Sequence, residues 1–530
     1  VPFWRSMILT NDHQPLQMPD DDWILTRHNS TGKPYPRAAR FNALLLQVPL
    51  SSTTPAVIRR AFFNTHQTFV SSKLLLQKFF EVFKGPPTSK LEQLTSTSSS
   101  STPDIDDPTD DHSASGDFST GFEYAGGRNP IERKVHEMRL RALLAIAFWI
   151  ESYVDDFVEN EDLLYNLNSW IDGPLIQAGY YHHATHLRRA ITLACTDYEQ
   201  RYPNTPLNPI DANFHTLHGI TEEYPNLPEP KVPKNIFAKD LSLLDISALE
   251  IARQVTIVEF RYFRRIRPKE LLFSLSKSKR RMRFSNLNAM RQRYDELSDW
   301  STVQLLSHPS KRTLLTKLVR VAYHLRELKN FQSAFAIISG LESPMVSQLP
   351  AWAELSPKVT QMYEALKKLI PRGSHQSANY LRQLLVSRPP CVPFINYICE
   401  ELQSIEVSSS DYVSSTLINF EKRVSCFDYQ QMLISYQKTP YHLQPVSQVA
   451  ALLDVNNASE RLRQLLTSKT GGANTLFQGA TSSLGFGILD SSGTSIGGSV
   501  IVSKSKDSKR KELKKRKSIY RGSMSIGSTK

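Results

Sequence analysis

Apolar residues recur at helical spacing in the first third of the chain. A helical region is expected from about Phe41, and Gly85-Pro86-Pro87 should end its last helix, because neither glycine nor proline continues a helix. The same spacing resumes near Met138 and predicts a broad apolar helix face. The recurring positions are Phe62, Phe63, Phe69, Leu74, Leu75, Phe79, Phe80 and Phe83, then Met138, Leu140, Leu143, Leu144, Ala147, Phe148, Ile150 and Val154.

A second helical region begins near Leu241 and continues to about Leu466. Ser247 is suited to cap a helix, and Glu250 stands three residues later, which completes a capping-box pattern. Ser356-Pro357 is another helix start, since proline is tolerated at the first helical position. The chain shows no run of strands with alternating apolar residues. The predicted fold class is therefore all-α.

Composition divides the helical regions. Residues 88–127 are rich in serine and aspartate and predict a disordered insertion, because such a segment cannot bury a core. Residues 200–235 contain seven prolines and predict a semi-extended linker. The expected divisions are an irregular segment 1–34, a helical module 35–175 holding the insertion 88–127, a linker 176–237, a larger helical domain 238–468, and a disordered Gly/Ser-rich and basic tail 469–530.

The net charge of +13 is concentrated in the tail. Ten basic and two acidic residues lie between Lys504 and Arg521, so the helical body is only weakly basic and no nucleic-acid partner is expected. Four scattered cysteines indicate a reducing, intracellular compartment, and no apolar run is long enough to span a membrane. We expect a cytoplasmic protein. Because the chain begins at Val1 rather than at a methionine, the presence of an upstream targeting signal is left open.

Candidate chemistry is sparse. His182 and His186 have the spacing of two metal ligands on a helix, but an exposed polar helix is the favoured interpretation. Cys391 lies in an apolar setting that should keep its thiol inert. The basic residues between Arg261 and Arg283 are dense, and a solvated helix face is favoured over a phosphate-binding patch. No glycine-rich phosphate loop follows a strand. We therefore expect no metal, no cofactor and no covalent catalysis.

The stretch from Pro390 to Arg423 predicts a helical hairpin. Phe394, Ile398, Leu402 and Ile405 form one apolar stripe, which leaves the other faces of that helix to the remaining side chains. Ser408 to Asp411 supplies a polar turn whose side chains can cap the second helix. The stripe alone fits either a packed structural hairpin or one that enters a partner. The residues left for the other faces are Tyr397, Glu400, Glu401, Gln403, Ser404 and Val407.

Residues 238–450 resemble the catalytic domain of Ras-type guanine nucleotide exchange factors, the family of Son-of-sevenless. Residues 35–175 look like the helical N-terminal module of that family, through Val57 to Phe63 and Arg139 to Phe157. The segments that carry the resemblance in the larger domain are Leu244-Asp245, Ile251 to Thr256, Glu259-Phe260, Ile266 to Leu271, Asn286-Leu287, Met290, Leu297 to Trp300, Leu328 to Phe331, Ile337 to Leu341, Ser343 to Val346, Pro390 to Phe394, Leu417 to Arg423 and Pro440-Tyr441.

The resemblance implies that the hairpin opens the nucleotide site of a Ras-subfamily small GTPase, Ras or Rap, without a cofactor. Asn330 and Phe394 match positions that support or form the GTPase-facing surface. Gln403 matches a position near the Mg²⁺ site, Glu406 would oppose the phosphate-binding region, and Val407 stands where the family has a second acid. Ser408-Ser409 replace the family's Gly-Asn. These departures favour a rival hypothesis, a weakly active homologue that binds a GTPase or another signalling partner as a scaffold.

The basic tail supplies a second expected contact. A Lys/Arg cluster gains about 1 kcal/mol per basic residue close to an anionic membrane. A nuclear-import or solubilising role for the tail fits equally well. Recruitment of the protein to a membrane is therefore one of two open interpretations.

Overall fold

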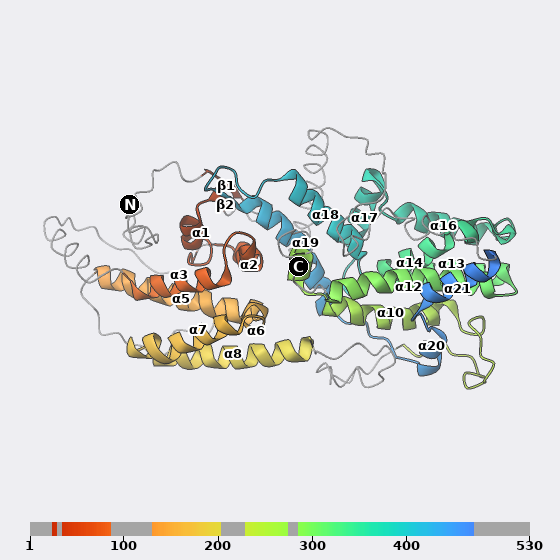
Figure 1. Ribbon diagram of the computed structural model, residues 1–530, viewed down its shortest axis with the longest axis horizontal. Coiled ribbons are helices and arrows are strands. Elements are labelled where there is room, and N and C mark those ends of the chain that lie inside the picture. Colours follow the sequence, from red (N-terminus) through yellow and green to blue (C-terminus); the bar gives the residue numbers. More distant parts are fainter. Residues whose placement is uncertain are drawn as a thin grey trace, which may run out of the picture. The chain divides into compact units, whose positions relative to one another are not determined.

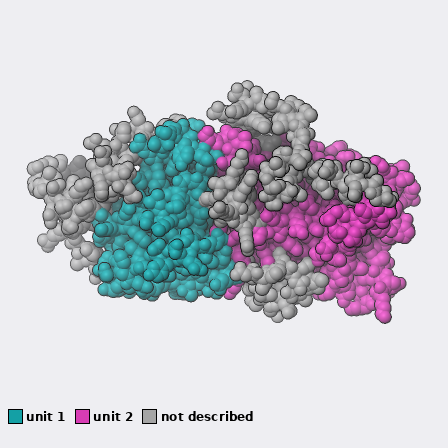
Figure 2. All heavy atoms as spheres, in the orientation of Figure 1, with its two compact units in different colours: residues 1–199, 411–424 teal, residues 200–410, 425–530 magenta. Residues whose placement is uncertain are grey.

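The computed structural model describes residues 24–28, 34–52, 54–85, 130–202, 228–273 and 285–470 (Figure 1). The predicted insertion 88–127, the tail from 471 and most of the proline-rich stretch lie outside these residues. The described part is predominantly helical, as the sequence predicts. It divides into two compact units, Val1–Glu199 with Asp411–Val424, and Gln200–Ser410 with Ser425–Lys530 (Figure 2). Each unit is described by itself.

The first unit is built on aromatic packing between helices that enclose Phe63. The Phe63 ring lies 6.2 Å from that of Phe79 and 5.8 Å from that of Trp149, and all three side chains are buried. Phe63 and Phe79 belong to the periodic positions that predicted the helical module, and Trp149 lies beside Phe148 and Ile150, which do as well. The elements of this unit are β1 (Ile24–His28), β2 (Pro34–Ala39), α1 (Phe41–Gln47), α2 (Ala56–Thr65), η3 (His66–Thr68), α3 (Ser72–Lys84), α5 (Pro130–Tyr153), α6 (Asp155–Val158), α7 (Glu161–Trp170), η4 (Ile171–Leu175), α8 (Tyr181–Arg201) and β3 (Ile418–Asn419).

Helix α3 shows how local sequence sets its ends. The Ser71 hydroxyl accepts a hydrogen bond from the Leu74 N–H at 3.2 Å, which satisfies one of the free donors of the first turn. The helix ends at Gly85, whose φ of 78° lies in the left-handed region that suits glycine. The expected stop at Gly85 is therefore confirmed.

The first unit also contains a small sheet that the pattern of the chain does not predict. Strand β2 pairs antiparallel with β1, through Thr26 and Pro36, and with β3, through Ala38 and Asn419. Strand β1 lies in the segment expected to be irregular. Proline residues in β2 obscure it, and its partner β3 is nearly four hundred residues away in the sequence, so no local alternation marks the sheet.

The linker expected over 176–237 also differs from the structure. Its first part forms α8, whose Ala184 and Leu187 are buried in the first unit. The prolines on which the expectation rested begin only after this helix. Residues 176–199 are thus part of the first unit rather than a connection.

The second unit is a packed group of helices around a large apolar core, drawn in green to blue in Figure 1. Helix α19 begins within the segment assigned to the first unit and continues in the second from Ser425. The elements are α10 (Ala248–Arg265), α11 (Pro268–Phe273), α12 (Ser285–Ser307), α13 (Lys311–Glu327), α14 (Phe331–Leu341), α15 (Pro344–Ser347), η6 (Pro350–Trp352), α16 (Pro357–Leu369), α17 (Ser374–Val386), α18 (Ile395–Ser408), α19 (Phe420–Lys438), α20 (Ser447–Leu452) and α21 (Ala458–Thr470).

Helices α12 and α14 approach closely because α14 carries Gly340. A Cβ atom at this position would overlap the Ser298 carbonyl oxygen on α12. The Thr302 hydroxyl uses the approach to donate a hydrogen bond to the Gly340 carbonyl at 2.9 Å. A residue without a side chain therefore sets the spacing of two central helices.

Two predicted helix starts are confirmed in this unit. Ser247 precedes α10, and its hydroxyl accepts from the Glu250 N–H at 3.1 Å. The Glu250 carboxylate accepts from the Lys231 N–H at 2.9 Å and from the Gln254 amide at 2.8 Å, so it ties down residues before and within the helix. Pro357 occupies the first turn of α16, after Ser356.

Candidate functional site

The start of α18 is held by the backbone of the loop before α14. The Phe331 N–H donates to the Val392 carbonyl at 2.9 Å, and the Val392 N–H donates to the Lys329 carbonyl at 3.0 Å. Asn330 lies between these bonds and pairs with Val392 as a parallel bridge. The segment that leads into the hairpin is thus fixed to the core before the helix begins.

Asn330 is fully buried, and both ends of its side-chain amide are bonded. Its Oδ1 accepts from the Ser333 N–H at 3.1 Å, which caps α14, and its Nδ2 donates to the Thr256 hydroxyl at 3.2 Å. The side chain therefore offers no surface to a partner in this conformation. Of the two roles that the resemblance allows, support and contact, the geometry fits support.

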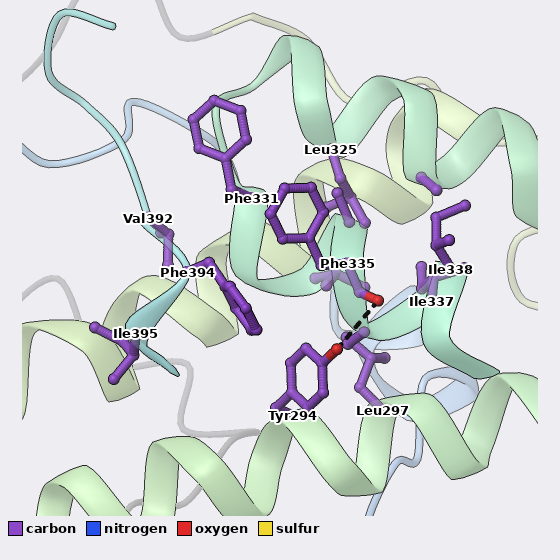
Figure 3. Close-up of a cluster of buried hydrophobic side chains, with 14 of the residues drawn as sticks. Tyr294, Leu297, Leu325, Phe331, Phe335, Ile337, Ile338, Val392, Phe394 and Ile395 are labelled. Carbon is purple, nitrogen blue, oxygen red and sulfur yellow. Dashed lines mark hydrogen bonds between the residues drawn. The ribbon is translucent and has the colours of Figure 1, made fainter. Parts of the chain in front are cut away.

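Phe394 lies in the core as well, with 4% of its surface exposed. Figure 3 shows its ring between those of Tyr294 and Phe335, whose centroids lie 5.5 and 5.4 Å away. Edge-to-face and tilted pairs of this kind add to the free energy gained from burial. Phe394 therefore fixes the first turn of α18. Its burial indicates a supporting role rather than direct contact with a partner.

The predicted apolar stripe of α18 is confirmed, because Phe394, Ile398, Leu402 and Ile405 are all buried. Burial extends beyond the stripe to Tyr397 and Glu401, which the helical spacing left to the other faces. The Tyr397 ring packs edge-on against Tyr380 at 5.1 Å, and the Glu401 carboxylate accepts from the Tyr429 hydroxyl at 3.1 Å. Helices α17 and α19 supply these contacts, so α18 is covered over more than one face.

The C-terminal end of α18 differs from its start. Gln403, Glu406 and Val407 are exposed, and Val407 shows 76% of its surface. The apolar side chain of Val407, in the last turn of α18, is thus open to solvent. These three candidate residues lie together on the outer side of one rigid helix, whereas Asn330 and Phe394 lie beneath its base.

The connection after α18 is longer than the turn expected at Ser408–Asp411. Asn419, not Asp411, caps α19, through a bond of 3.2 Å from the Lys422 N–H to its Oδ1. The Asp411 carboxylate instead accepts from Lys422 Nζ and from Arg423, each at 2.7 Å. Burial alone would raise the pKa of Asp411, but these two cations hold it below its ordinary value.

The structure also shows how far the other residues considered from the sequence are buried. Cys391 is buried, as its apolar setting predicted, and burial raises the pKa of its thiol. His182 is exposed on α8, and burial together with neighbouring histidines lowers the pKa of His183. In the basic stretch, Arg261 is buried, while residues 274–284 lie outside the described part of the chain.

Across the described ranges, His, Cys, Asp and Glu side chains form no group that could hold a metal ion. Nor does any helix within these ranges have the length and hydropathy that a membrane span requires.

Two residues near the start of α18 carry no signal in the sequence. Phe394 supplies no side-chain cap of its own, and the first N–H groups of the helix are bonded by Tyr380 and Gln332 from other helices. Neither acceptor belongs to a local capping pattern, because Tyr380 lies 14 residues before Phe394 and Gln332 lies 63 residues before Ile395. Only a three-dimensional structure could identify them.

Two family models match the chain. The RasGEF domain covers residues 250–424 and includes all of α18, and the RasGEF N-terminal motif covers residues 37–170. The chain therefore carries a RasGEF domain together with a RasGEF N-terminal motif. The resemblance noted from the hairpin and its flanking segments is thereby confirmed, and the match to the RasGEF N-terminal motif falls on the helical module of the first unit.

Relatives of the RasGEF chain carry matching names. Ras guanine nucleotide exchange factor A of Dictyostelium discoideum is 30% identical over 61% of this chain and 52% of its own length. Ras guanine nucleotide exchange factor J of the same organism is 27% identical over 80% of this chain and 46% of its own length. Guanine nucleotide-releasing factor 2 of Drosophila melanogaster is 29% identical over 38% of this chain and 12% of its own length. The chain spans about half the length of the first two relatives.

Proposed function

We propose that this RasGEF chain promotes release of GDP from a Ras-subfamily small GTPase, Ras or Rap, by inserting the α18 hairpin at the switch and Mg²⁺ region. The observation that carries the proposal is the architecture of α18 within the matched RasGEF domain. Its base is buried, and its outer end presents Gln403, Glu406 and Val407 to solvent.

Insertion would work through linkage rather than covalent chemistry. A protein that binds the nucleotide-free GTPase more tightly than the GDP-bound form weakens nucleotide binding by the same coupling free energy. In this account Glu406 opposes the phosphate-binding region and Gln403 approaches the position of the Mg²⁺ ion. Val407 contacts an apolar part of the GTPase, and the exchange factor needs no cofactor.

The buried base supports this division of roles. An element that displaces part of a partner must resist the opposing force, and a helix anchored by backbone bonds and aromatic packing does so better than a loop. Asn330 and Phe394 serve as that anchor, so their contribution to exchange is indirect. The exposed end of α18 is left to determine which GTPase is bound.

A second candidate function is a scaffold that binds a GTPase, or another signalling partner, with little acceleration of exchange. The exposed Val407 favours it, because an apolar side chain cannot compete electrostatically with a phosphate group. Ser408 and Ser409, in place of the family's Gly-Asn, lie at the same end of the helix.

Release of a labelled GDP from a panel of Ras-subfamily GTPases separates the two candidates. We expect acceleration for at least one Ras or Rap protein. Tight binding without acceleration would support the scaffold. Neither binding nor acceleration across the panel would reject both exchange and a GTPase scaffold, and would leave only a scaffold for another signalling partner.

The proposal extends to location. We infer a cytoplasmic protein that the Lys/Arg-rich tail recruits to anionic membranes, where Ras-subfamily GTPases would be met. Deletion of residues 503–530 should lower binding to vesicles that contain phosphatidylserine and leave binding to vesicles without it unchanged. Unchanged binding to the anionic vesicles would remove the membrane contact and leave the exchange proposal intact.

A further inference from the structure

The first turn of α18 is capped from outside. The first N–H groups of an α-helix have no partner within the helix, and a side chain at the cap position commonly accepts from them. Here the Phe394 N–H donates to the Tyr380 hydroxyl oxygen at 2.7 Å, and the Ile395 N–H donates to Gln332 Oε1 at 3.1 Å. Tyr380 belongs to α17 and Gln332 to α14.

Both acceptors are themselves fixed. The Tyr380 side chain is fully buried, and its ring packs against those of Phe331 at 5.4 Å and Phe335 at 5.5 Å. Gln332 is 1% exposed and lies in the first turn of α14, directly after the loop that pairs with Val392. Neither side chain can turn away from α18 without disturbing the core. The two caps therefore determine where the helix begins and in which direction it leaves the core.

We propose that Tyr380 and Gln332 are positioning residues for nucleotide exchange, acting through the direction of α18; this inference rests on the proposed function. The helix has 14 residues and is therefore about 21 Å long. A tilt of about 10° at its start would move its far end by about 4 Å. Misplacement by about 1 Å can already slow a reaction a hundredfold. Loss of either cap could therefore displace Gln403, Glu406 and Val407 far enough to slow exchange.

Tyr436 offers a matched control. Its hydroxyl donates to the Leu384 carbonyl at 2.6 Å, and its side chain is buried in the same unit. Tyr380→Phe and Tyr436→Phe each remove one buried hydroxyl group and one hydrogen bond. The two variants should lose a similar free energy of unfolding. Only Tyr380→Phe, however, leaves the Phe394 N–H at the start of α18 without its acceptor.

The test combines exchange kinetics with hydrogen exchange on the full chain. We expect Tyr380→Phe to lower kcat for GDP release about fivefold, the effect of about 1 kcal/mol, while KM for the GTPase changes less than about twofold, because the exposed contact residues are retained. Protection of the Phe394 and Ile395 amides should fall as well. Tyr436→Phe should leave kcat, KM and these two amides near their wild-type values.

Gln332→Met is a second variant that removes the other acceptor with little change in volume. It should lower kcat in the same way and expose the Ile395 amide most. Equal effects of Tyr380→Phe and Tyr436→Phe on kcat would overturn the inference. If the wild-type chain accelerates no GTPase, the proposed function fails, and hydrogen exchange then decides alone: equal protection of the two amides in both tyrosine variants would reject positioning by Tyr380.

Discussion

The two ends of α18 are built differently. At the start, Phe394 is enclosed by aromatic rings and Asn330 is bonded at both ends of its amide, so little can change without cost to the fold. At the other end, Gln403, Glu406 and Val407 face solvent on the same helix. The contrast separates a buried part that holds the position of the helix from an exposed part, and under the proposed function the exposed part meets the partner.

The largest expected effect is at the buried start. Phe394→Ala should lower the free energy of unfolding by about 3–5 kcal/mol, because it removes a packed aromatic ring and leaves a cavity. Urea unfolding of the full chain measures this. His182→Ala, an exposed change on α8, is the control and should stay within about 0.5 kcal/mol. Similar losses in the two variants would mean that Phe394 does not anchor the helix.

The core of the second unit should tolerate a larger side chain as poorly as a smaller one. Gly340→Ala would drive a Cβ atom into the Ser298 carbonyl and should cost about 1–3 kcal/mol through the separation of α12 from α14. Gly173→Ala is the control, since an added Cβ there meets no atom within 4 Å. Equal thermal shifts for the two alanine variants would contradict the close approach.

A loss similar in size to that of Gly340→Ala is expected at the helix cap beneath the hairpin. Asn330→Ala removes the α14 cap and leaves the buried Thr256 hydroxyl without its amide donor, at a cost of about 2 kcal/mol. Asn160→Ala removes an exposed cap from α7, where Asn160 Oδ1 accepts from the Leu163 N–H at 3.1 Å, and should cost about 1 kcal/mol. Guanidinium unfolding should resolve the difference, and a larger loss at Asn160 would argue against the buried amide.

The smallest effect on stability belongs to the exposed end. Glu406→Ala and Val407→Ala should each change the free energy of unfolding by less than about 0.5 kcal/mol, because neither side chain is buried. Thermal unfolding checks this. A loss above about 1 kcal/mol in either variant would show that the end of α18 is held by packing rather than left for a partner.

Local signals in the sequence predicted much of this arrangement. Ser247, Pro357 and Gly85 mark helix ends through chemistry that acts within a few residues, and the α18 stripe follows from helical spacing. The periodic positions likewise identified the two helical regions. Contacts between distant residues carried no such signal. The pairing of Ala38 with Asn419 and the burial of Glu401 beside Tyr429 depend on the completed fold.

The candidate site divides along the same line. Family resemblance selected Asn330, Phe394, Gln403, Glu406 and Val407, but could not say which of them are exposed. Burial separates the first two from the other three. Gln332 and Tyr380 stayed unnoticed because an acceptor that caps a helix from another part of the fold leaves no pattern in the sequence around it.

The most direct measurement is GDP release from a responsive Ras-subfamily GTPase, with the wild-type chain beside the triple variant Gln403→Ala/Glu406→Ala/Val407→Ala. The account predicts that the triple variant unfolds at the wild-type urea concentration yet accelerates release at least about tenfold less, a loss of about 1.4 kcal/mol of transition-state stabilisation. A folded triple variant that exchanges at the wild-type rate would contradict it.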